Sequence, residues 1–128
     1  MPKTLKTIAV LLVLITGFFY AAESIAGKAL KKDSATIQSV KPDIVCMVND
    51  EVMNKPQIKV PFEGRIYYGC CPACVSTLKN DRSMRYSKDP VTGVEVDKAK
   101  AFILEGENGA ALYFQSSETA RKYLASKR

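Results

Sequence analysis

The sequence predicts an α+β fold made of two tandem units, each a β-hairpin followed by a helix. Twice along the chain, two strand-like apolar runs flank a turn that contains glycine. Each pair of runs precedes a segment whose apolar residues recur at helical spacing. The total length of 128 residues allows no more than one compact domain besides the terminal segments.

The first unit spans residues 44–81, and its elements follow from local signals. Strands are expected at Ile58 to Phe62 and at Arg65 to Gly69, joined by a turn at Glu63-Gly64. A helix is expected from about Pro72, because proline at the first helical position lacks only an N–H group that would be unpaired there. Cys71 would then lie near the helix cap.

The second unit spans residues 88–126 and repeats this order. Strands are expected at Lys100 to Glu105 and at Ala110 to Phe114, separated by the turn Gly106 to Gly109. A helix is expected from about Ser117, because Ser116 is a favourable cap. Alignment of the two units places each cysteine of the first opposite a residue without sulfur: Cys46 opposite Asp89, Cys70 opposite Gln115 and Cys74 opposite Thr119. We therefore expect only the first unit to carry a cysteine site.

The N-terminal region has the pattern of an export signal. Residues 1–26 combine basic Lys3 and Lys6, a long apolar run and the small-x-small sequence at Ser24 to Ala26. Residues 27–43 are polar and aperiodic and are expected to form a tether before a domain at 44–128. We expect cleavage after the signal, no stable membrane insertion afterwards, and localisation in an oxidising compartment, the bacterial periplasm.

Composition argues against two classes of function. The chain contains no histidine. Without an imidazole there is no ordinary general base and no Cys-His pair, so we expect the protein not to be an enzyme. Its 19 lysines and arginines exceed 13 aspartates and glutamates, but they are scattered along the chain, which does not favour nucleic-acid binding.

Three of the four cysteines lie in the stretch "GRIYYGCCPACVSTLKND", residues 64–81. Cys70 and Cys74 flank a predicted helix start, where unpaired N–H groups stabilise thiolates. Cys46 lies in a short polar knuckle before the hairpin and can fold back beside that helix start. Thiolates without imidazole favour soft ions such as Cu(I) and Zn(II). Trigonal sulfur coordination suits Cu(I), whereas zinc would need a fourth ligand, which Cys71 or a water molecule would supply.

The spacing C-x23-C-x3-C of these cysteines, with "GRIYYGCCPACVSTLKND" and the later "DPVTGVEV", resembles the TRASH and YHS superfamily of small metal-binding domains. The resemblance implies a fold like a treble clef or zinc ribbon. It also implies that Cys46 is the knuckle ligand, Cys70 the ligand ending the second strand and Cys74 the ligand in the first helical turn. Family members are implicated in copper and heavy-metal trafficking, sensing and resistance. The chain departs from the family in a longer first spacing, in Gly69 where an aromatic residue is usual, and in the additional Cys71.

Two other functions remain open for the cysteines. In an oxidising compartment Cys46 can form a structural disulfide with one member of the cluster. The tetrapeptide C-P-A-C, Cys71 to Cys74, can act as a thiol-disulfide oxidoreductase pair.

The sequence favours a protein that binds a soft metal through Cys46, Cys70 and Cys74, with Cys71 as a candidate fourth ligand. Cu(I) is the first expectation and Zn(II) the second. The expected roles are metallochaperone, buffer or resistance factor, with a metal-donor or metal-acceptor protein as partner.

Overall fold

The structure is a computed structural model that describes residues 37–128, so the predicted signal peptide lies outside the described residues. The α+β class is confirmed. Within residues 37–128, eight short strands pair into four antiparallel hairpins, and two α-helices follow the second and the fourth hairpin. The elements are β1 (Val45–Cys46), β2 (Glu51–Val52), β3 (Ile58–Phe62), β4 (Arg65–Gly69), α2 (Pro72–Asn80), β5 (Tyr86–Lys88), β6 (Glu95–Asp97), β7 (Phe102–Glu105), β8 (Ala111–Phe114) and α3 (Ser117–Ser126).

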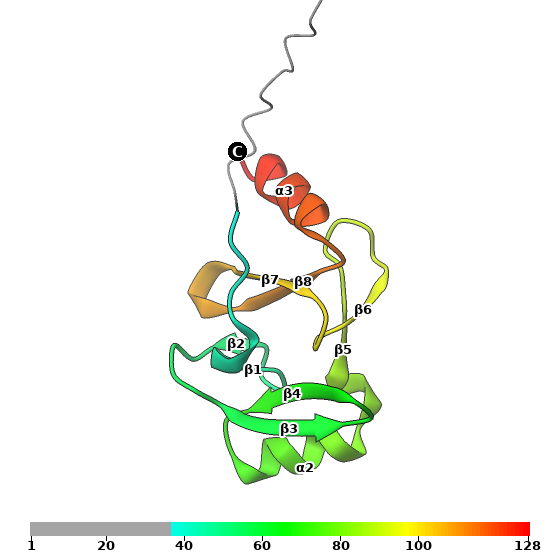
Figure 1. The fold of residues 1–128 in the computed structure, drawn as a ribbon. Coiled ribbons are helices and arrows are strands. Elements are labelled where there is room, and N and C mark those ends of the chain that lie inside the picture. Colours follow the sequence, from blue (N-terminus) through cyan, green and yellow to red (C-terminus); the bar gives the residue numbers. More distant parts are fainter. Residues whose placement is uncertain (1–36) are drawn as a thin grey trace, which may run out of the picture. The chain divides into compact units, whose positions relative to one another are not determined.

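The order of the elements repeats along the chain (Figure 1). In the first half, the β1–β2 hairpin precedes the β3–β4 hairpin and α2. In the second half, the β5–β6 hairpin precedes the β7–β8 hairpin and α3. Each predicted polar knuckle is therefore the loop of an additional small hairpin. The two ends of each knuckle pair through their backbones as short antiparallel strands. The composition of a short polar segment does not indicate this pairing.

The strands of the first half have the predicted bounds. The turn between β3 and β4 contains Glu63 and Gly64, both with positive φ, which is the backbone that two-residue hairpin loops require. In the second half, β7 begins two residues later than predicted. The reason is a turn in which the N–H of Lys100 donates to the carbonyl of Asp97, at 2.9 Å.

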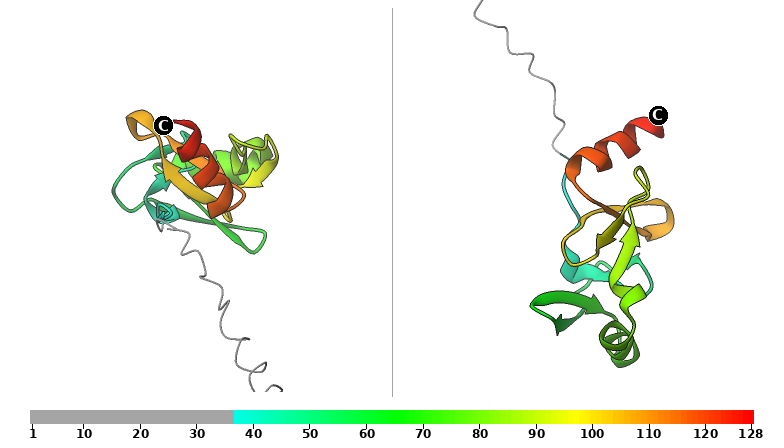
Figure 2. Two further views of the ribbon diagram at one scale, coloured as in Figure 1. Left: turned by 90° about the horizontal axis from the view of Figure 1, so that it is seen from above. Right: turned by 90° about the vertical axis from the view of Figure 1, so that its right-hand side faces the viewer.

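Both α-helices begin where the sequence predicts. Pro72 occupies the first turn of α2, after Cys71 in an extended conformation. In α3 the hydroxyl of Ser116 accepts a hydrogen bond from the N–H of Thr119, at 3.3 Å, within a capping box. Helix α2 packs against β3 and β4, and α3 against β7 and β8 (Figure 2). Within residues 37–128, no helix has the length and apolar character that a membrane crossing requires.

The folded part starts earlier than predicted. The N–H of Val40 donates to the carbonyl of Ile103 at 2.8 Å, and the N–H of Ile103 donates to the hydroxyl of Ser39 at 2.9 Å. Residues Pro42–Ile44 then form a 3-10 helix. The last residues of the predicted tether, 27–43, thus belong to the domain. Their attachment is a backbone contact with a distant strand, which polar composition does not indicate.

One apolar core joins the two halves. Its fully buried members from the first half include Val45, Met47, Val60, Tyr67 and Leu78, and from the second half Ile103 and Tyr113. Polar contacts add to this core. The hydroxyl of Tyr67 donates to Asp97 at 3.0 Å, and Arg65 forms an ion pair with the same carboxylate. The second half is therefore packed against the hairpin that leads to the cysteine cluster.

A buried carboxylate, that of Asp89, joins separate segments of the second half through hydrogen bonds. Asp89 is 1 % exposed, and its oxygens accept hydrogen bonds from the N–H groups of Val91 (2.8 Å), Thr92 (3.3 Å) and Gln115 (2.9 Å). Burial raises the pKa of Asp89, but these N–H groups and the hydroxyl of Thr119 outweigh burial and hold the pKa below its ordinary value. Asp89, Gln115 and Thr119, the residues that align with Cys46, Cys70 and Cys74, are thus joined by hydrogen bonds in the second half.

Replacement of Asp89 by asparagine should lower the free energy of unfolding by about 1–3 kcal/mol at neutral pH, because a buried, hydrogen-bonded charge is lost. The folded-state pKa of Asp89 is depressed, so its contribution to stability is present above the unfolded pKa and is lost as the pH falls through the folded pKa. Urea denaturation of both proteins should therefore show a constant difference above about pH 5 that shrinks below about pH 3.9. The exposed Asp43→Asn is the control, with an expected change within about 0.5 kcal/mol. Equal stability of Asp89→Asn and wild type would contradict this role.

Candidate metal centre

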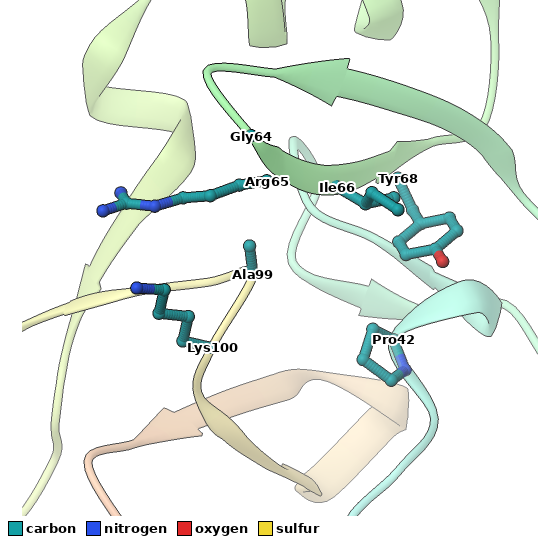
Figure 3. A pocket seen from close by; sticks show the side chains of 7 residues that line it. All are labelled: Pro42, Gly64, Arg65, Ile66, Tyr68, Ala99 and Lys100. Atoms are coloured by element: carbon teal, nitrogen blue, oxygen red, sulfur yellow. The ribbon is translucent and has the colours of Figure 1, made fainter.

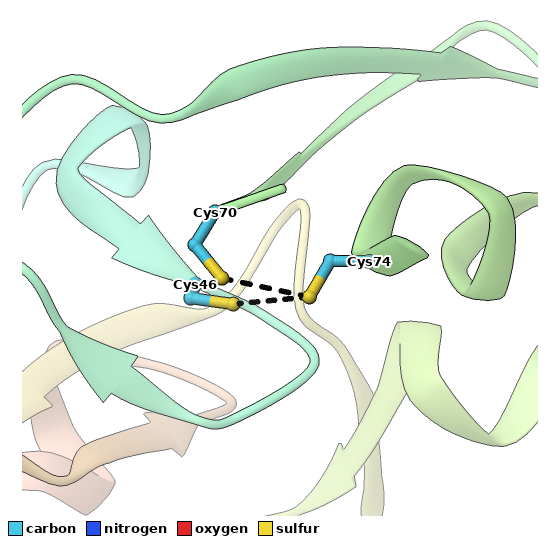
Figure 4. A group of neighbouring side chains, drawn as sticks. All are labelled: Cys46, Cys70 and Cys74. Atoms are coloured by element: carbon cyan, nitrogen blue, oxygen red, sulfur yellow. Dashed lines mark hydrogen bonds between the residues drawn. The ribbon is translucent and has the colours of Figure 1, made fainter. Parts of the chain in front are cut away.

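Three cysteine sulfurs converge on one point (Figure 4). Cys46 ends β1, Cys70 follows the last residue of β4, and Cys74 lies in the first turn of α2. The Sγ atoms of Cys70 and Cys74 are 3.6 Å apart, and those of Cys46 and Cys74 are 3.9 Å apart. All three sulfurs lie within 4.8 Å of one another. The triad predicted from the sequence is therefore assembled by three separate elements.

These separations suit a shared metal ion. A metal about 2.3 Å from each sulfur separates its ligands by about 3.8 Å in a tetrahedron and by about 4.0 Å in a trigonal plane. Two of the separations, 3.6 Å and 3.9 Å, bracket the tetrahedral value, and the third, between Cys46 and Cys70, is at most 4.8 Å. The sulfurs thus need little movement to coordinate one ion.

The fourth thiol contacts only part of the triad. The Sγ atom of Cys71 lies 3.5 Å from that of Cys74, but Cys71 is not a member of the mutually close group. Cys74 is therefore the common neighbour of the other three cysteines. All four cysteines are free in the structure.

The four cysteines differ in their exposure to solvent. Cys46 is 0 % exposed and Cys74 is 7 % exposed, whereas Cys70 and Cys71 are only partly buried. The side-chain amide of Asn49, which is exposed, donates to the sulfur of Cys70 at 3.9 Å. A molecule arriving from solvent therefore meets Cys70 and Cys71 before the other two sulfurs.

Backbone N–H groups surround the most buried sulfur. Burial raises the pKa of Cys46, but the N–H groups of Asn49, Val48 and Cys70 outweigh burial, so the net effect is a lowered pKa. These donors are the residues two and three positions after Cys46 and the residue two positions before helix α2. Asp89 has its N–H donors at the corresponding positions of the second half. The repeated frame thus directs backbone N–H groups at the sulfur of Cys46 in one half and at the carboxylate of Asp89 in the other, and in each it favours the ionised form.

The other thiols cannot all ionise in the absence of a cation. Burial, together with hydrogen bonds to the sulfurs of Cys71 and Cys70, raises the pKa of Cys74 to about 12. The hydrogen bond with Cys74 lowers the pKa of Cys70, but the interactions with Cys46, burial and the hydrogen bond with Cys71 together outweigh it, so the net shift is upward. The N–H of Cys74 faces Cys71 and lowers the pKa of that thiol. Since close thiolates repel one another, a bound cation would favour full deprotonation.

Gly69 allows the close approach that forms the site. A Cβ atom at this position would lie 2.9 Å from Cβ of Cys74 and 3.3 Å from its carbonyl carbon. Such contacts are too short, so a side chain here would push the end of β4 away from the start of α2. This explains why position 69 is glycine, although the family that the sequence resembles usually has an aromatic residue there. The absence of a side chain at Gly69 allows Cys70 and Cys74 to lie close together.

Sequence reasoning missed the residue that holds the Cys46 knuckle. Lys98 is 3 % exposed, and its ammonium group donates to the carbonyl of Met47 at 2.7 Å and forms an ion pair with Asp50. The N–H of Ala111 also donates to the carbonyl of Asp50, at 2.8 Å. The second half thus anchors the loop after Cys46. A single lysine in a polar segment carries no sequence signal for such a contact.

A surface pocket of about 340 Å³ lies beside strand β4 (Figure 3). It contains no cysteine and no carboxylate, and the charged side chain of Arg65 at its edge is already paired with Asp97. Its lining residues are Pro42, Gly64, Arg65, Ile66, Tyr68, Ala99 and Lys100. The candidate metal centre is therefore the sulfur cluster and not this pocket.

Comparison with known proteins does not identify the site. The chain matches no family model, no curated protein and no solved structure. The structure brings Cys46, Cys70 and Cys74 together as predicted and leaves Cys71 beside Cys74. Any functional assignment must therefore come from the chemistry of these residues.

Gly69→Ala should lower the free energy of unfolding by about 1–3 kcal/mol, because the new Cβ overlaps Cys74 and the start of α2. Urea denaturation of the reduced protein measures this change. The control is Gly106→Ala, whose Cβ would approach the flexible end of Leu112 at 3.0 Å and should cost less. A smaller effect at Gly69 than at Gly106 would show that the strand and the helix are not in close contact.

Lys98→Met should lower the free energy of unfolding by about 1–3 kcal/mol, since the buried Met47 carbonyl loses its donor and Asp50 its ion pair. Amide hydrogen exchange should become faster at Val48 and Asn49 and stay unchanged in α3. The control is Lys122→Met, which removes an exposed pair with Glu118 and should change stability by less than about 0.5 kcal/mol. Unchanged exchange in the knuckle would refute the anchoring role of Lys98.

Proposed function

We propose that this protein binds one soft metal ion through the thiolates of Cys46, Cys70 and Cys74. The observation that carries the proposal is the convergence of three sulfurs to within 4.8 Å of one another. A position equidistant from all three would satisfy the ordinary metal–sulfur distance of about 2.3 Å with small side-chain shifts.

Cu(I) is the ion that this donor set favours, and Zn(II) is second. Three thiolates and no imidazole select soft ions over magnesium, calcium or manganese. Three thiolates around Cu(I) leave a net charge of −2, which the N–H groups around Cys46 and the start of α2 would stabilise. Zn(II) would require a fourth ligand, and Cys71, with its sulfur 3.5 Å from Cys74, is the nearest candidate.

The biological role belongs to the same proposal. The register of the cysteines and the "DPVTG" segment support assignment to the TRASH and YHS type of domain, with a fold like a treble clef. The export pattern in residues 1–26 supports a periplasmic location. In that compartment the protein would act as a metallochaperone, buffer or resistance factor that exchanges metal with a donor or acceptor protein.

Redox chemistry is the second candidate function. The sulfurs of Cys71 and Cys74 are 3.5 Å apart, in a C-x-x-C arrangement at a helix start. Cys46 and Cys74, at 3.9 Å, could instead close a structural disulfide. Clear turnover in an insulin-reduction assay would favour the oxidoreductase. Labelling of only two of the four cysteines, in protein that is freshly isolated and denatured without reductant, would favour the structural disulfide.

Anaerobic titration of the reduced protein with Cu(I) and with Zn(II), in competition with a chromophoric chelator, tests the proposal. We expect one tightly bound ion per chain. Serine substitution of Cys46, Cys70 or Cys74 should each weaken binding by at least about tenfold, or about 1.4 kcal/mol, because a ligand is lost. Cys71→Ser should weaken Cu(I) binding less than Cys74→Ser.

Two results would refute the metal site. One is failure of both ions to bind more tightly than about 1 μM. The other is binding that is unaffected by Cys70→Ser. Ser76→Ala is the matched control, because Ser76 is an exposed residue of α2 outside the sulfur cluster.

A further inference from the structure

We propose that Cys71 is the exchange ligand of the metal centre, the thiol through which a thiolate-bound metal ion enters and leaves the buried triad. This inference rests on the proposed metal binding. It assigns to Cys71 a role in the rate of transfer and not in the final affinity. The partner it implies is a donor or acceptor that presents the ion on its own thiolates.

The exposure of the four sulfurs supports this assignment. Cys46 and Cys74 are 0 % and 7 % exposed, so a metal still bound to another molecule cannot reach them first. Cys70 is accessible, but it follows directly on β4 and is already a member of the triad. Cys71 is accessible and lies outside the triad, so it can bind the incoming ion before the other sulfurs are engaged.

The position of Cys74 gives the ion a short path inward. Its sulfur is 3.5 Å from Cys71, 3.6 Å from Cys70 and 3.9 Å from Cys46. An ion held by Cys71 and Cys74 can therefore bind Cys70 and then Cys46 without leaving Cys74. Each new metal–sulfur bond forms before the bond to Cys71 breaks.

The surface next to Cys71 permits such an approach. The adjacent Pro72 and Ala73 are exposed, small and uncharged. The first turn of α2 contains no acidic residue, so a donor that carries negative thiolates meets no like charge there. A donor can thus bring its metal–sulfur bond to the end of the helix.

Each exchange step balances without an oxidant. The thiolate of Cys71 forms a bond to the ion while one donor thiolate leaves, and that thiolate or solvent takes up the proton that Cys71 releases. Bonds to Cys74, Cys70 and Cys46 then replace the remaining donor bonds and the bond to Cys71, and each of these three thiols passes its proton to a departing thiolate, that of Cys71 included, or to solvent. The metal keeps its oxidation state throughout.

The experiment separates rate from affinity with the full chain. Cu(I) is supplied as its glutathione complex to reduced wild type, Cys71→Ser, Cys70→Ser and Ser76→Ala, and loading is followed by stopped-flow absorbance. Serine is a favourable N-cap residue, so Cys71→Ser should keep the fold, which circular dichroism verifies. We expect loading of Cys71→Ser to slow by about tenfold or more, with an affinity within about threefold of wild type. Ser76→Ala should behave as wild type.

Each outcome has one interpretation. Loading of Cys71→Ser at the wild-type rate would overturn the exchange role and leave the proposed metal binding intact. A loss of affinity as large as that of Cys70→Ser would make Cys71 a permanent ligand, which also overturns the inference. Failure of the wild type to bind Cu(I) at all would refute the proposed function itself.

Discussion

The interaction on which the site depends is the crowding of three sulfurs around one buried thiol. Cys74 has the other cysteines at 3.5, 3.6 and 3.9 Å, and burial raises its pKa to about 12. Among the described residues, the hydrogen-bonding partners of the sulfurs are one another, the amide of Asn49 and backbone N–H groups. Such a cluster is stable as thiols, but in the absence of a cation it resists conversion to thiolates. A soft cation removes that barrier, so the same crowding that suppresses ionisation prepares the site for a metal.

The two halves share the same arrangement of hairpins and helix, but different side chains occupy the centre of each half. In the first half, N–H groups surround the sulfur of Cys46, and Gly69 lets strand and helix approach until the sulfurs touch. In the second half, the corresponding N–H groups bind the carboxylate of Asp89. The strand there ends on Phe114, whose ring packs against Tyr123 at 5.4 Å. The second half is therefore closed by hydrogen bonds and aromatic packing, and through Lys98 it supports the knuckle that carries Cys46.

Local signals explain what the sequence could predict. The turn at Glu63-Gly64, Pro72 at the start of α2 and the Ser116 cap are short-range features, and the strands and helices beside them lie where expected. The cysteine triad could also be predicted from the sequence, because its members lie at the ends of short elements that local signals define. The burial of Lys98, the attachment of Ser39 to β7 and the role of Gly69 depend on residues far away in the chain. Such contacts are set by packing, which composition and periodicity do not encode.

The most direct test of the metal centre is X-ray absorption spectroscopy on the anaerobic protein loaded with one equivalent of Cu(I). The account predicts a first shell of three sulfur atoms at a single distance of about 2.3 Å and no nitrogen or oxygen neighbour. In Cys74→Ser, which lacks the common neighbour of the other sulfurs, this shell should be lost. A wild-type first shell made of nitrogen or oxygen, or one that Cys74→Ser leaves unchanged, would contradict the account.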